Sequence, residues 1–291
     1  MRSQKSYETQ TAGILYLVPT PIGNLEDMTL RALRILKEVD LIASEDTRNT
    51  QKLLNYFDIP TRQISFHEHN SSERITQLVT KLTEGSSIAQ VSDAGMPSIS
   101  DPGHDLVKAC IKENISVVPL PGASAGLTAL IASGLSPQPF YFYGFLPRKK
   151  KEQLSVLTEM NQRSESIILY ESPYRLKEVV KNLATVLGKN RKIVLCRELT
   201  KRYEEFLRGT LEEAEEWLKT SEVRGEFCLI LEGNKVGTFI QENKDWEEST
   251  ISEHVKQVMK NKQITSKEAI KEVAKIREMK KQVVYAEYHE I

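Results

Sequence analysis

Short apolar segments alternate with amphipathic segments along most of the chain. Runs rich in β-branched residues, typical of buried strands, occur at residues 14–18, 41–43, 64–66, 88–91, 117–120, 140–145, 167–170, 193–196 and 227–231. Between them, apolar residues recur at helical spacing in residues 29–39, 72–82, 104–112, 124–132 and 174–187. This alternation predicts an α/β protein built from βαβ units, and two doubly wound sheets fit it better than one.

Changes in this pattern divide the chain into segments. We predict a flexible N-terminal tail at residues 1–12, an N-terminal α/β domain at 13–146, a second α/β domain at 147–232, a linker at 233–250 and a small helical domain at 251–291. In the last segment, Thr265 and Glu268 have the spacing of a capping box, which predicts a helix start. A helix-turn-helix-sized unit and a plain helical cap both fit this segment.

Composition and charge indicate a folded protein that does not span a membrane. The 291 residues carry 40 basic and 40 acidic side chains and are 40% hydrophobic, which excludes a disordered or supercharged chain. No apolar run approaches the roughly 20 residues that cross a bilayer, and residues 1–13 lack the apolar stretch of a secretory signal. Cys110, Cys196 and Cys228 lie far apart in apolar segments. We therefore expect buried thiols in a reducing, cytoplasmic compartment.

The net charge of zero hides a difference between the two halves. Residues 1–146 contain 12 basic and 15 acidic side chains, whereas residues 147–291 contain 28 and 25. Part of the basic excess lies in residues 252–291, and part lies in a basic cluster made of Arg148, Lys149, Lys150 and Lys151. Such clusters permit a nucleic-acid partner, although a solvated helix surface has the same composition.

Three loops that follow predicted strands are rich in proline and glycine beside polar residues. They span residues 19–24, 92–103 and 121–126. Proline and glycine fix the direction of the backbone and leave its amides and carbonyls accessible. Because strand ends in an open α/β sheet form one crevice, we predict that these loops bind a common ligand. Neither a P-loop nor a GxGxxG fingerprint is present, so phosphate-led binding is disfavoured.

A serine hydrolase is a competing interpretation of one of these loops. Residues 122–126 match the GxSxG elbow around Ser124, after a strand and at the start of a helix. The downstream histidines, His254 and His289, come after the predicted linker. A catalytic triad would therefore require the C-terminal helices to fold over the sheet.

Titratable residues at other strand ends also allow two interpretations. The run His67-Glu68-His69 lacks the spacing of a zinc site and has no cysteine nearby. Glu45, Asp46 and Glu171 directly follow predicted strands. They could act as bases or bind a cationic ligand, or they could cap helices.

Several of these segments form motifs that, taken together, are specific for one protein family. They lie at residues 17–32, 44–48, 66–70, 92–103, 119–125, 142–148 and 170–175. In them the chain resembles the ribosomal RNA small subunit methyltransferase I family, a branch of the tetrapyrrole methylase superfamily. The resemblance covers about residues 14–232, and the C-terminal segment is similar, more weakly, to the family's small helix-turn-helix domain. Tyr174 is a departure, because many members of the family have histidine there.

The resemblance implies two α/β/α domains of the tetrapyrrole methylase type, with S-adenosylmethionine in the cleft between them. It implies a homodimer that methylates a cytidine ribose 2′-hydroxyl in the decoding region of small-subunit ribosomal RNA, either as naked RNA or as the 30S subunit. No metal is expected. Carried over by motif, the expected cofactor-binding positions are Thr20, Pro21, Ile22, Asp93, Ala94, Gly95, Pro97, Ile99, Gly122, Ala123, Ser124, Tyr170 and Glu226.

In this reaction the methyl donor is already activated, so positioning the hydroxyl in line supplies most of the acceleration. A carboxylate or histidine that takes the hydroxyl proton adds to it. The candidates are Glu45, Asp46, His67 and Glu171, and the basic cluster is the expected site for RNA phosphates. A porphyrinoid C-methyltransferase of the same superfamily and a non-catalytic RNA-binding or ribosome assembly factor are the alternatives.

Overall fold

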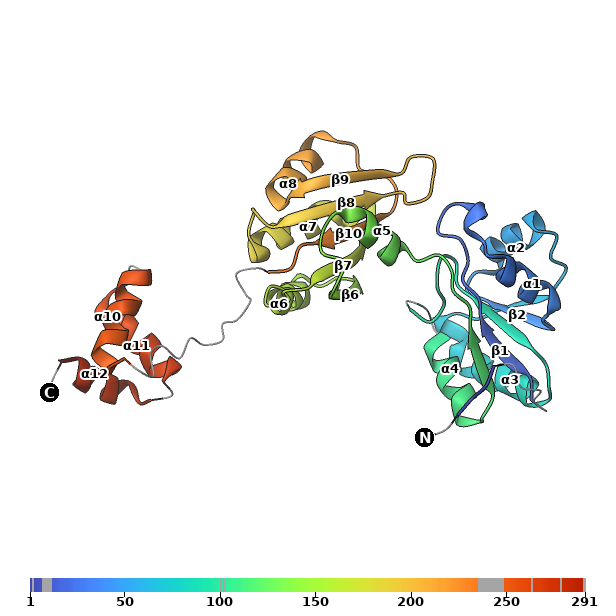
Figure 1. Cartoon of the computed structure of the whole chain (residues 1–291), viewed down its shortest axis with the longest axis horizontal. Coiled ribbons are helices and arrows are strands. Elements are labelled where there is room, and N and C mark those ends of the chain that lie inside the picture. Colours follow the sequence, from blue (N-terminus) through green and yellow to red (C-terminus); the bar gives the residue numbers. More distant parts are fainter. Residues whose placement is uncertain are drawn as a thin grey trace. The chain divides into compact units, whose positions relative to one another are not determined.

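The computed structural model describes residues 1, 3–6, 12–99, 101, 103–234, 249–262, 264–277 and 279–289 (Figure 1). The chain divides into two compact units, residues 1–234 and residues 235–291. The larger unit contains two sheets, and the smaller unit contains helices. None of the described helices is long and apolar enough to cross a membrane. Much of the predicted tail and linker lies outside the described residues, so these two assignments stay predictions.

The first sheet is fully parallel. Among the residues that the structure describes it has five strands, in the order β3-β2-β4-β1-β5. The strands are β1 (Ile14–Leu17), β2 (Leu41–Ser44), β3 (Gln63–Ser65), β4 (Ile88–Val91) and β5 (Ser116–Pro119). The segments between them contain η1 (Leu25–Asp27), α1 (Leu30–Glu38), α2 (Thr47–Tyr56), η2 (Glu68–Asn70), α3 (Ser71–Thr83) and α4 (Gly103–Lys112). The predicted βαβ pattern is confirmed here, and it brings the carboxyl ends of the strands to one edge.

Helices cover both faces of the first sheet. On β2, Ile42 joins an apolar cluster with α1 and α2, whereas Ala43 joins a cluster with α3 and α4. Successive residues separate in this way because strand side chains alternate between faces. Side-chain caps fix where the helices begin, since Thr29 accepts a hydrogen bond from the N–H of Ala32 at the start of α1. The sheet is therefore a rigid base for the loops at its carboxyl edge.

The second sheet is mixed, with the strand order β6-β7-β10-β8-β9. Its strands are β6 (Phe140–Phe145), β7 (Ser166–Glu171), β8 (Lys192–Arg197), β9 (Glu205–Thr210) and β10 (Phe227–Leu231), and its helices are α5 (Ala125–Ser133), α6 (Lys150–Met160), α7 (Pro173–Leu187) and α8 (Leu211–Thr220). β6 and β7 are parallel, whereas β10 is antiparallel to β7 and β8, and β9 is antiparallel to β8. The predicted second α/β/α domain is confirmed, since helices pack on both faces of this sheet, but its strands do not all run in the one direction that a repeated βαβ pattern would give.

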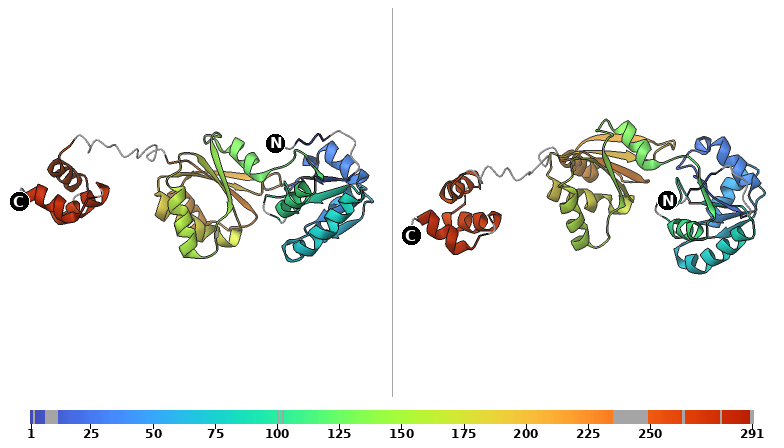
Figure 2. Two further views of the ribbon diagram at one scale, coloured as in Figure 1. Left: turned by 90° about the horizontal axis from the view of Figure 1, so that it is seen from below. Right: turned by 60° about the horizontal axis from the view of Figure 1, so that its bottom comes forward.

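The second sheet includes residues that the sequence analysis assigned to the first domain. α5 packs through Ala129 and Leu130 on the face that carries Ile168, while α6, α7 and α8 cover the opposite face (Figure 2). β6 pairs with β7. The chain therefore leaves the first sheet within residues 120–124, well before the expected boundary at residue 146. α5 is apolar on nearly all sides, so its pattern does not indicate which sheet it covers.

The smaller unit has a core of its own. The helices α10 (Ile251–Lys262), α11 (Ser266–Ile276) and α12 (Lys281–His289) bury Val255, Val273 and Val284 in one apolar cluster. At the start of α11, Glu268 accepts hydrogen bonds from the backbone N–H of Thr265 at 3.0 Å and from its hydroxyl at 2.7 Å. The predicted helix start is confirmed, and the three helices pack around a common core.

Candidate active site at the strand ends

Two loops at the carboxyl edge of the first sheet are joined by hydrogen bonds. Thr20, after β1, exchanges two backbone hydrogen bonds of 3.0 Å with Gly95, after β4. The Thr20 hydroxyl also donates to the carbonyl of Ser92 at 3.1 Å, and this bond is buried. The two loops therefore form one fixed surface.

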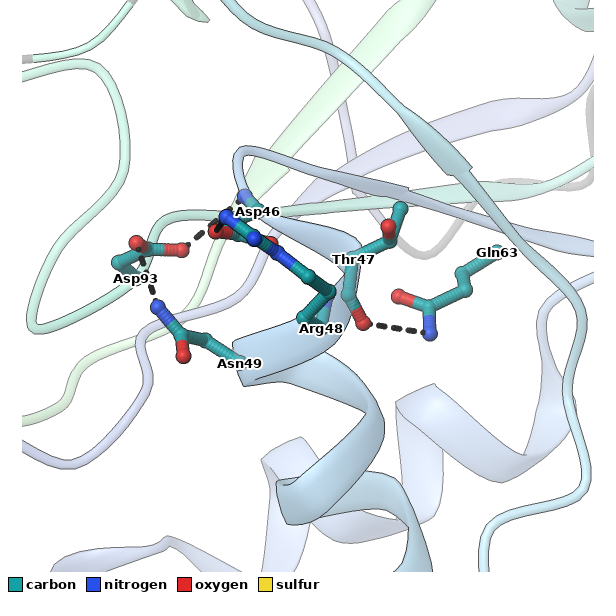
Figure 3. A network of polar contacts seen from close by, with 6 residues as sticks. All are labelled: Asp46, Thr47, Arg48, Asn49, Gln63 and Asp93. Carbon is teal, nitrogen blue, oxygen red and sulfur yellow. Dashed lines mark hydrogen bonds and ion pairs between the residues drawn. The ribbon is translucent and has the colours of Figure 1, made fainter.

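Asp93 connects this surface to the loop after β2 (Figure 3). Its carboxylate accepts hydrogen bonds from the backbone N–H of Asp46 at 3.1 Å and from the side-chain amide of Asn49 at 3.0 Å. Its own N–H donates to Oε2 of Glu45 at 3.1 Å. Burial raises the pKa of Glu45, and this hydrogen bond offsets the increase only in part. Glu45 is thus held at the edge of the sheet with one of its oxygens already engaged.

The side chain of Asp46 caps the start of α2. It accepts a hydrogen bond from the N–H of Arg48 at 2.9 Å and two more from the Arg48 guanidinium at 2.7 and 3.1 Å (Figure 3). These bonds lower the pKa of Asp46 to about 2. A carboxylate that is so stable as an anion is a weak proton acceptor near neutral pH.

The second sheet contributes the ends of three neighbouring strands. The register places Glu171, at the end of β7, opposite Phe227, at the start of β10, and Phe227 opposite Arg197, at the end of β8. Adjacent strands lie about 4.8 Å apart. Residue 171, residue 226 and the turn at 198–201 therefore gather at one edge of this sheet.

The Glu171 carboxylate is buried at this edge, with 1% of its side chain exposed. Oε1 accepts the backbone N–H of Ser172 at 2.8 Å. Oε2 lies 3.6 Å from the Arg175 guanidinium and has no hydrogen-bond partner within the described part of the chain. Burial raises the pKa of Glu171, and the contacts with Ser172 and Arg175 offset this only in part. A buried acceptor without a donor is uncommon and requires an explanation.

Tyr170, the neighbour of Glu171, fixes the start of α5. Its hydroxyl accepts the N–H of Gly126 at 3.0 Å, and its ring meets the ring of Phe142 edge-on with 5.3 Å between centroids. Burial raises the pKa of Tyr170 to about 12. The phenol therefore stays protonated and holds α5 against the sheet.

Loops from both sheets enclose a cavity of about 480 Å³, a size that suits a nucleoside-like ligand. The first sheet supplies Ile22, Glu45, Ser92, Ala94, Gly95, Met96, Ile99 and Asp101, and the second supplies Ser124, Ala125, Phe145, Tyr170, Glu171, Ser172, Pro173, Cys196, Leu199, Lys201, Glu226, Phe227 and Cys228. Among these described lining residues, four have carboxyl side chains and one, Lys201, has a basic side chain. This excess of negative charge favours a ligand that carries positive charge.

Comparisons with known proteins agree with this architecture. The family model of the Tetrapyrrole (Corrin/Porphyrin) Methylases matches residues 14–215. The Ribosomal RNA small subunit methyltransferase I of Halalkalibacterium halodurans is 52% identical over 292 residues, which cover 100% of both chains. The protein of the same name from Bacillus subtilis is 51% identical over 290 residues, 99% of each chain. The chain belongs to the ribosomal RNA small subunit methyltransferase I family.

A solved structure extends the likeness to the fold. The uroporphyrin-III C-methyltransferase of Thermus thermophilus, in complex with S-adenyl homocysteine, superimposes with a TM-score of 0.55 at 21% identity. The superposition covers 78% of this chain and 100% of that chain. The chain therefore has the tetrapyrrole methylase fold.

The cavity contains about half of the site residues expected from the sequence. It is lined by Ile22, Glu45, Ala94, Gly95, Ile99, Ser124, Tyr170, Glu171 and Glu226. It is not lined by Thr20, Pro21, Asp46, His67, Asp93, Pro97, Gly122 or Ala123. Thr20 and Asp93 instead fix the loops that carry the lining residues. The roles assigned to individual residues stay predictions.

The lining positions that sequence reasoning missed include Asp101, Lys201 and Cys228. Asp101 lies inside a loop that the sequence analysis selected, yet its spacing gave no sign of its bonds. Lys201 and Cys228 are brought in by β8 and β10, whose antiparallel pairing the pattern could not indicate. Cys110, Cys196 and Cys228 are buried free thiols, as predicted.

The serine hydrolase interpretation gains no support from the cavity. Ser124 precedes α5 but makes no side-chain cap bond, and no histidine is among the described residues that line the cavity. His67 and His69 lie together away from it, with 5.9 Å between ring centroids. A nucleophilic serine requires a base within hydrogen-bond reach.

Proposed function

We propose that this chain transfers a methyl group from S-adenosylmethionine to small-subunit ribosomal RNA, at the 2′-hydroxyl of a cytidine in the decoding region. The observation that carries the proposal is full-length identity above 50% to proteins named for this RNA, together with a cavity at the strand ends of both sheets. The nucleoside and the oxygen that is methylated are the finer part of the proposal.

The cavity fits this cofactor chemically. S-adenosylmethionine has a sulfonium and an ammonium group against a single carboxylate, so it carries a net positive charge. The described lining residues have an excess of carboxyl groups, which attracts such a ligand. Apolar side chains of Ile22, Met96 and Leu199 offer surface for the adenine ring. When bound, the cofactor supplies an activated methyl group.

Glu171 is the proposed acceptor of the hydroxyl proton. Glu171 is one of the residues that line the cavity, and its buried Oε2 has no hydrogen-bond donor within the described part of the chain. Glu45 already accepts a backbone N–H with Oε2, while Asp46 is bound by Arg48 and, like His67, lies outside the lining. A ribose hydroxyl placed beside Glu171 would satisfy the unpaired oxygen and lose its proton to it.

The basic cluster is the proposed contact for RNA phosphates. Its four side chains are exposed at the start of α6. The residues just before it are held close to Glu171, because the Arg175 guanidinium donates to the carbonyls of Leu146 at 3.0 Å and Pro147 at 3.1 Å. An RNA backbone bound at the basic cluster would therefore pass near Glu171, the proposed proton acceptor.

Charge reversal tests this contact. The triple change Lys149→Glu, Lys150→Glu and Lys151→Glu is expected to weaken RNA binding at least tenfold and to flatten its salt dependence, because fewer counterions are released. The affinity for S-adenosylmethionine, measured by isothermal titration, should stay within about threefold of wild type, since these residues do not line the cavity. Lys108→Glu with Lys112→Glu, on exposed positions of α4, is the matched control. Equal losses in RNA and cofactor affinity would refute the assignment.

Ser124→Ala separates the proposed function from a hydrolase. Methyl transfer should fall less than about threefold, because no base is placed to activate the hydroxyl. Hydrolysis of p-nitrophenyl acetate by the wild type should not exceed that of the variant. Loss of an esterase activity with methyl transfer unchanged would revive the hydrolase.

The proposed function itself is tested with purified protein, tritiated S-adenosylmethionine, and 30S subunits or deproteinised RNA from cells that lack this enzyme. We expect label in 2′-O-methylcytidine, identified by nucleoside mass spectrometry. Label only in an added porphyrinoid would favour the superfamily alternative, and no cofactor binding would favour a non-catalytic RNA-binding factor. A homodimer remains part of the proposal, and the exposed Leu127 and Ile131 on α5 offer an apolar surface for it.

A further inference from the structure

The turn between β8 and β9 has an unusual backbone. Glu198 and Thr200 adopt φ values of 50° and 65°, in the left-handed region that residues other than glycine rarely enter. Hydrogen bonds hold the turn in place: the N–H of Glu198 donates to the carbonyl of Glu226 at 3.0 Å, and the N–H of Thr200 donates to Glu204 Oε2 at 2.7 Å. Strain that is fixed in this way clusters at functional sites.

The side chain that this turn presents is Lys201. Its ammonium nitrogen donates to Glu198 Oε1 at 3.0 Å and to Glu226 Oε2 at 2.9 Å. An ammonium has three N–H donors, so one remains for a ligand after these bonds within the described part of the chain. Partial burial lowers the pKa of Lys201, but the bonds to Glu226 and Glu198 outweigh it and raise the pKa overall. Lys201 therefore stays charged and fixed in position.

Lys201 lines the cavity, to which loops of both sheets contribute. It is the one basic side chain among the described lining residues. Its stem passes beside Gly23, where an added Cβ would lie 2.5 Å from Lys201 Cγ and 3.0 Å from the carbonyl oxygen of Leu199. Gly23 is thus required by the close approach of the loop after β1 to this lysine.

We propose that Lys201 is a catalytic residue, which donates a hydrogen bond to the ribose 2′ oxygen as that oxygen attacks the methyl group. This inference rests on the proposed function. The oxygen–carbon bond forms while the sulfur–carbon bond breaks, and the electron pair of the broken bond returns to sulfur. The hydroxyl proton passes to the carboxylate of Glu171. The third N–H of Lys201 stabilises the negative charge that grows on oxygen before the new bond is complete.

The surroundings of Lys201 favour this role over the binding of an anion. Glu198 and Glu226 together carry one more negative charge than Lys201 can balance. A phosphate or a cofactor carboxylate would therefore meet net repulsion at this point. A neutral hydroxyl carries no charge to be repelled in the ground state, and the third N–H of Lys201 donates to it directly, a contact that strengthens as charge develops in the transition state.

The test is Lys201→Met, which keeps the length of the side chain and removes the donor. The methyl transfer rate on saturating RNA and cofactor should fall by about 10²–10³-fold. The Kd for S-adenosylmethionine by isothermal titration and the Kd for RNA should each stay within about threefold of wild type. The decline of the rate on the acid side should persist in Lys201→Met, because Glu171 still takes the hydroxyl proton. Lys219→Met, at an exposed lysine that pairs with Glu216 at 2.8 Å, is the matched control.

Several results would overturn the inference. An unchanged rate would exclude a catalytic role, and a cofactor or RNA affinity that falls as far as the rate would make Lys201 a binding residue. If Lys201→Met does not fold, Lys201→Arg takes its place, because it keeps the cation but cannot put a single donor at the same point. A loss of about tenfold is then expected, and full activity would refute the role. A wild-type protein without methyl transfer would refute the proposed function itself.

Discussion

Replacing Glu171 with glutamine is expected to lower the rate of methyl transfer by about 10²–10⁴-fold, the usual contribution of a positioned base. Glutamine has the same shape and keeps an oxygen for the N–H of Ser172, which now bonds Oε1 at 2.8 Å. It cannot accept the proton of a ribose hydroxyl. The measurement is the single-turnover rate on 30S subunits at saturating S-adenosylmethionine, with cofactor affinity followed separately by titration.

The pH profile gives this prediction a second readout. Burial raises the pKa of Glu171, and a base acts only when it is deprotonated. The wild-type rate should therefore decline on the acid side at a pH above the usual range of a glutamate, and Glu171→Gln should lack that decline. An acid limb that persists in the variant would assign it to another group, with Glu45 the first alternative.

Stability separates a base from a structural ion pair. Because the pKa of Glu171 is higher in the folded state than in the unfolded state, the folded chain binds more protons between these two values. The free energy of unfolding therefore falls as pH rises through that window, and the cost of the buried charge is fully present above it. At pH 8, Glu171→Gln should melt at or above the wild-type temperature, as expected where activity is maintained at the expense of stability.

Glu178→Gln, at an exposed position of α7, should change neither the rate nor the melting temperature. If Glu171 mainly holds Arg175 in place, Glu171→Gln would lower the melting temperature and leave most of the activity. That pair of results would exclude Glu171 as the proton acceptor.

The first sheet could be predicted from the sequence because its strands are parallel and buried on both faces. β1, β2 and β4 are short apolar runs that join the clusters on both faces, so pattern and topology agree there. The second sheet could not be predicted in the same way. β9 is a half-buried edge strand that includes Glu205 and Arg208, and its pattern of apolar and polar residues does not predict a strand. The direction of its strands, which makes this sheet mixed, is set by tertiary pairing.

The same difference applies to the site. Proline and glycine in the loops after β1 and β4 are local signals, and those loops do line the cavity. The choice among carboxylates is not local, because Asp46 and Glu171 both follow strands and differ only in burial and partners. Lys201 acquires its role from Glu226, 25 residues away in the chain. Contacts of that kind become visible only when the chain is folded.

Asp101→Ala is expected to destabilise the larger unit by about 2–4 kcal/mol and to weaken S-adenosylmethionine binding at least tenfold. Its carboxylate accepts the N–H of Ser98 at 2.8 Å, the N–H of Gly103 at 2.8 Å and the side-chain amide of Gln90 at 3.2 Å. Alanine would leave these three donors without an acceptor. A fully buried donor that loses its acceptor costs about 1–3 kcal/mol of stability, and these three donors are part-buried. Ser98 has a φ of 71°, a strained conformation that these bonds help to hold.

The loss of cofactor affinity follows from the place of this loop. Ala94, Gly95, Met96 and Ile99 line the cavity, and Asp101 is the side chain that closes the loop onto the start of α4. Differential scanning fluorimetry should give a thermal midpoint about 5–15 °C lower than wild type, on the usual scaling for a unit of this size. Added S-adenosylmethionine should raise the midpoint less in the variant, because stabilisation by a ligand depends on its Kd.

Two further variants make the prediction specific to the hydrogen bonds of Asp101. Asp101→Asn keeps one acceptor oxygen and removes the negative charge. Because burial raises the pKa of the Asp101 carboxyl group, the loss of that charge costs little, and the variant should lose less stability than Asp101→Ala. Asp105→Ala, an exposed change on α4 at a residue 3.8 Å from Lys108, should leave both stability and cofactor affinity near wild type. If Asp101→Ala melts and binds the cofactor as the wild type does, the loop keeps its shape without Asp101, and the bonds of Thr20, Asp93 and Gly95 are sufficient to position it.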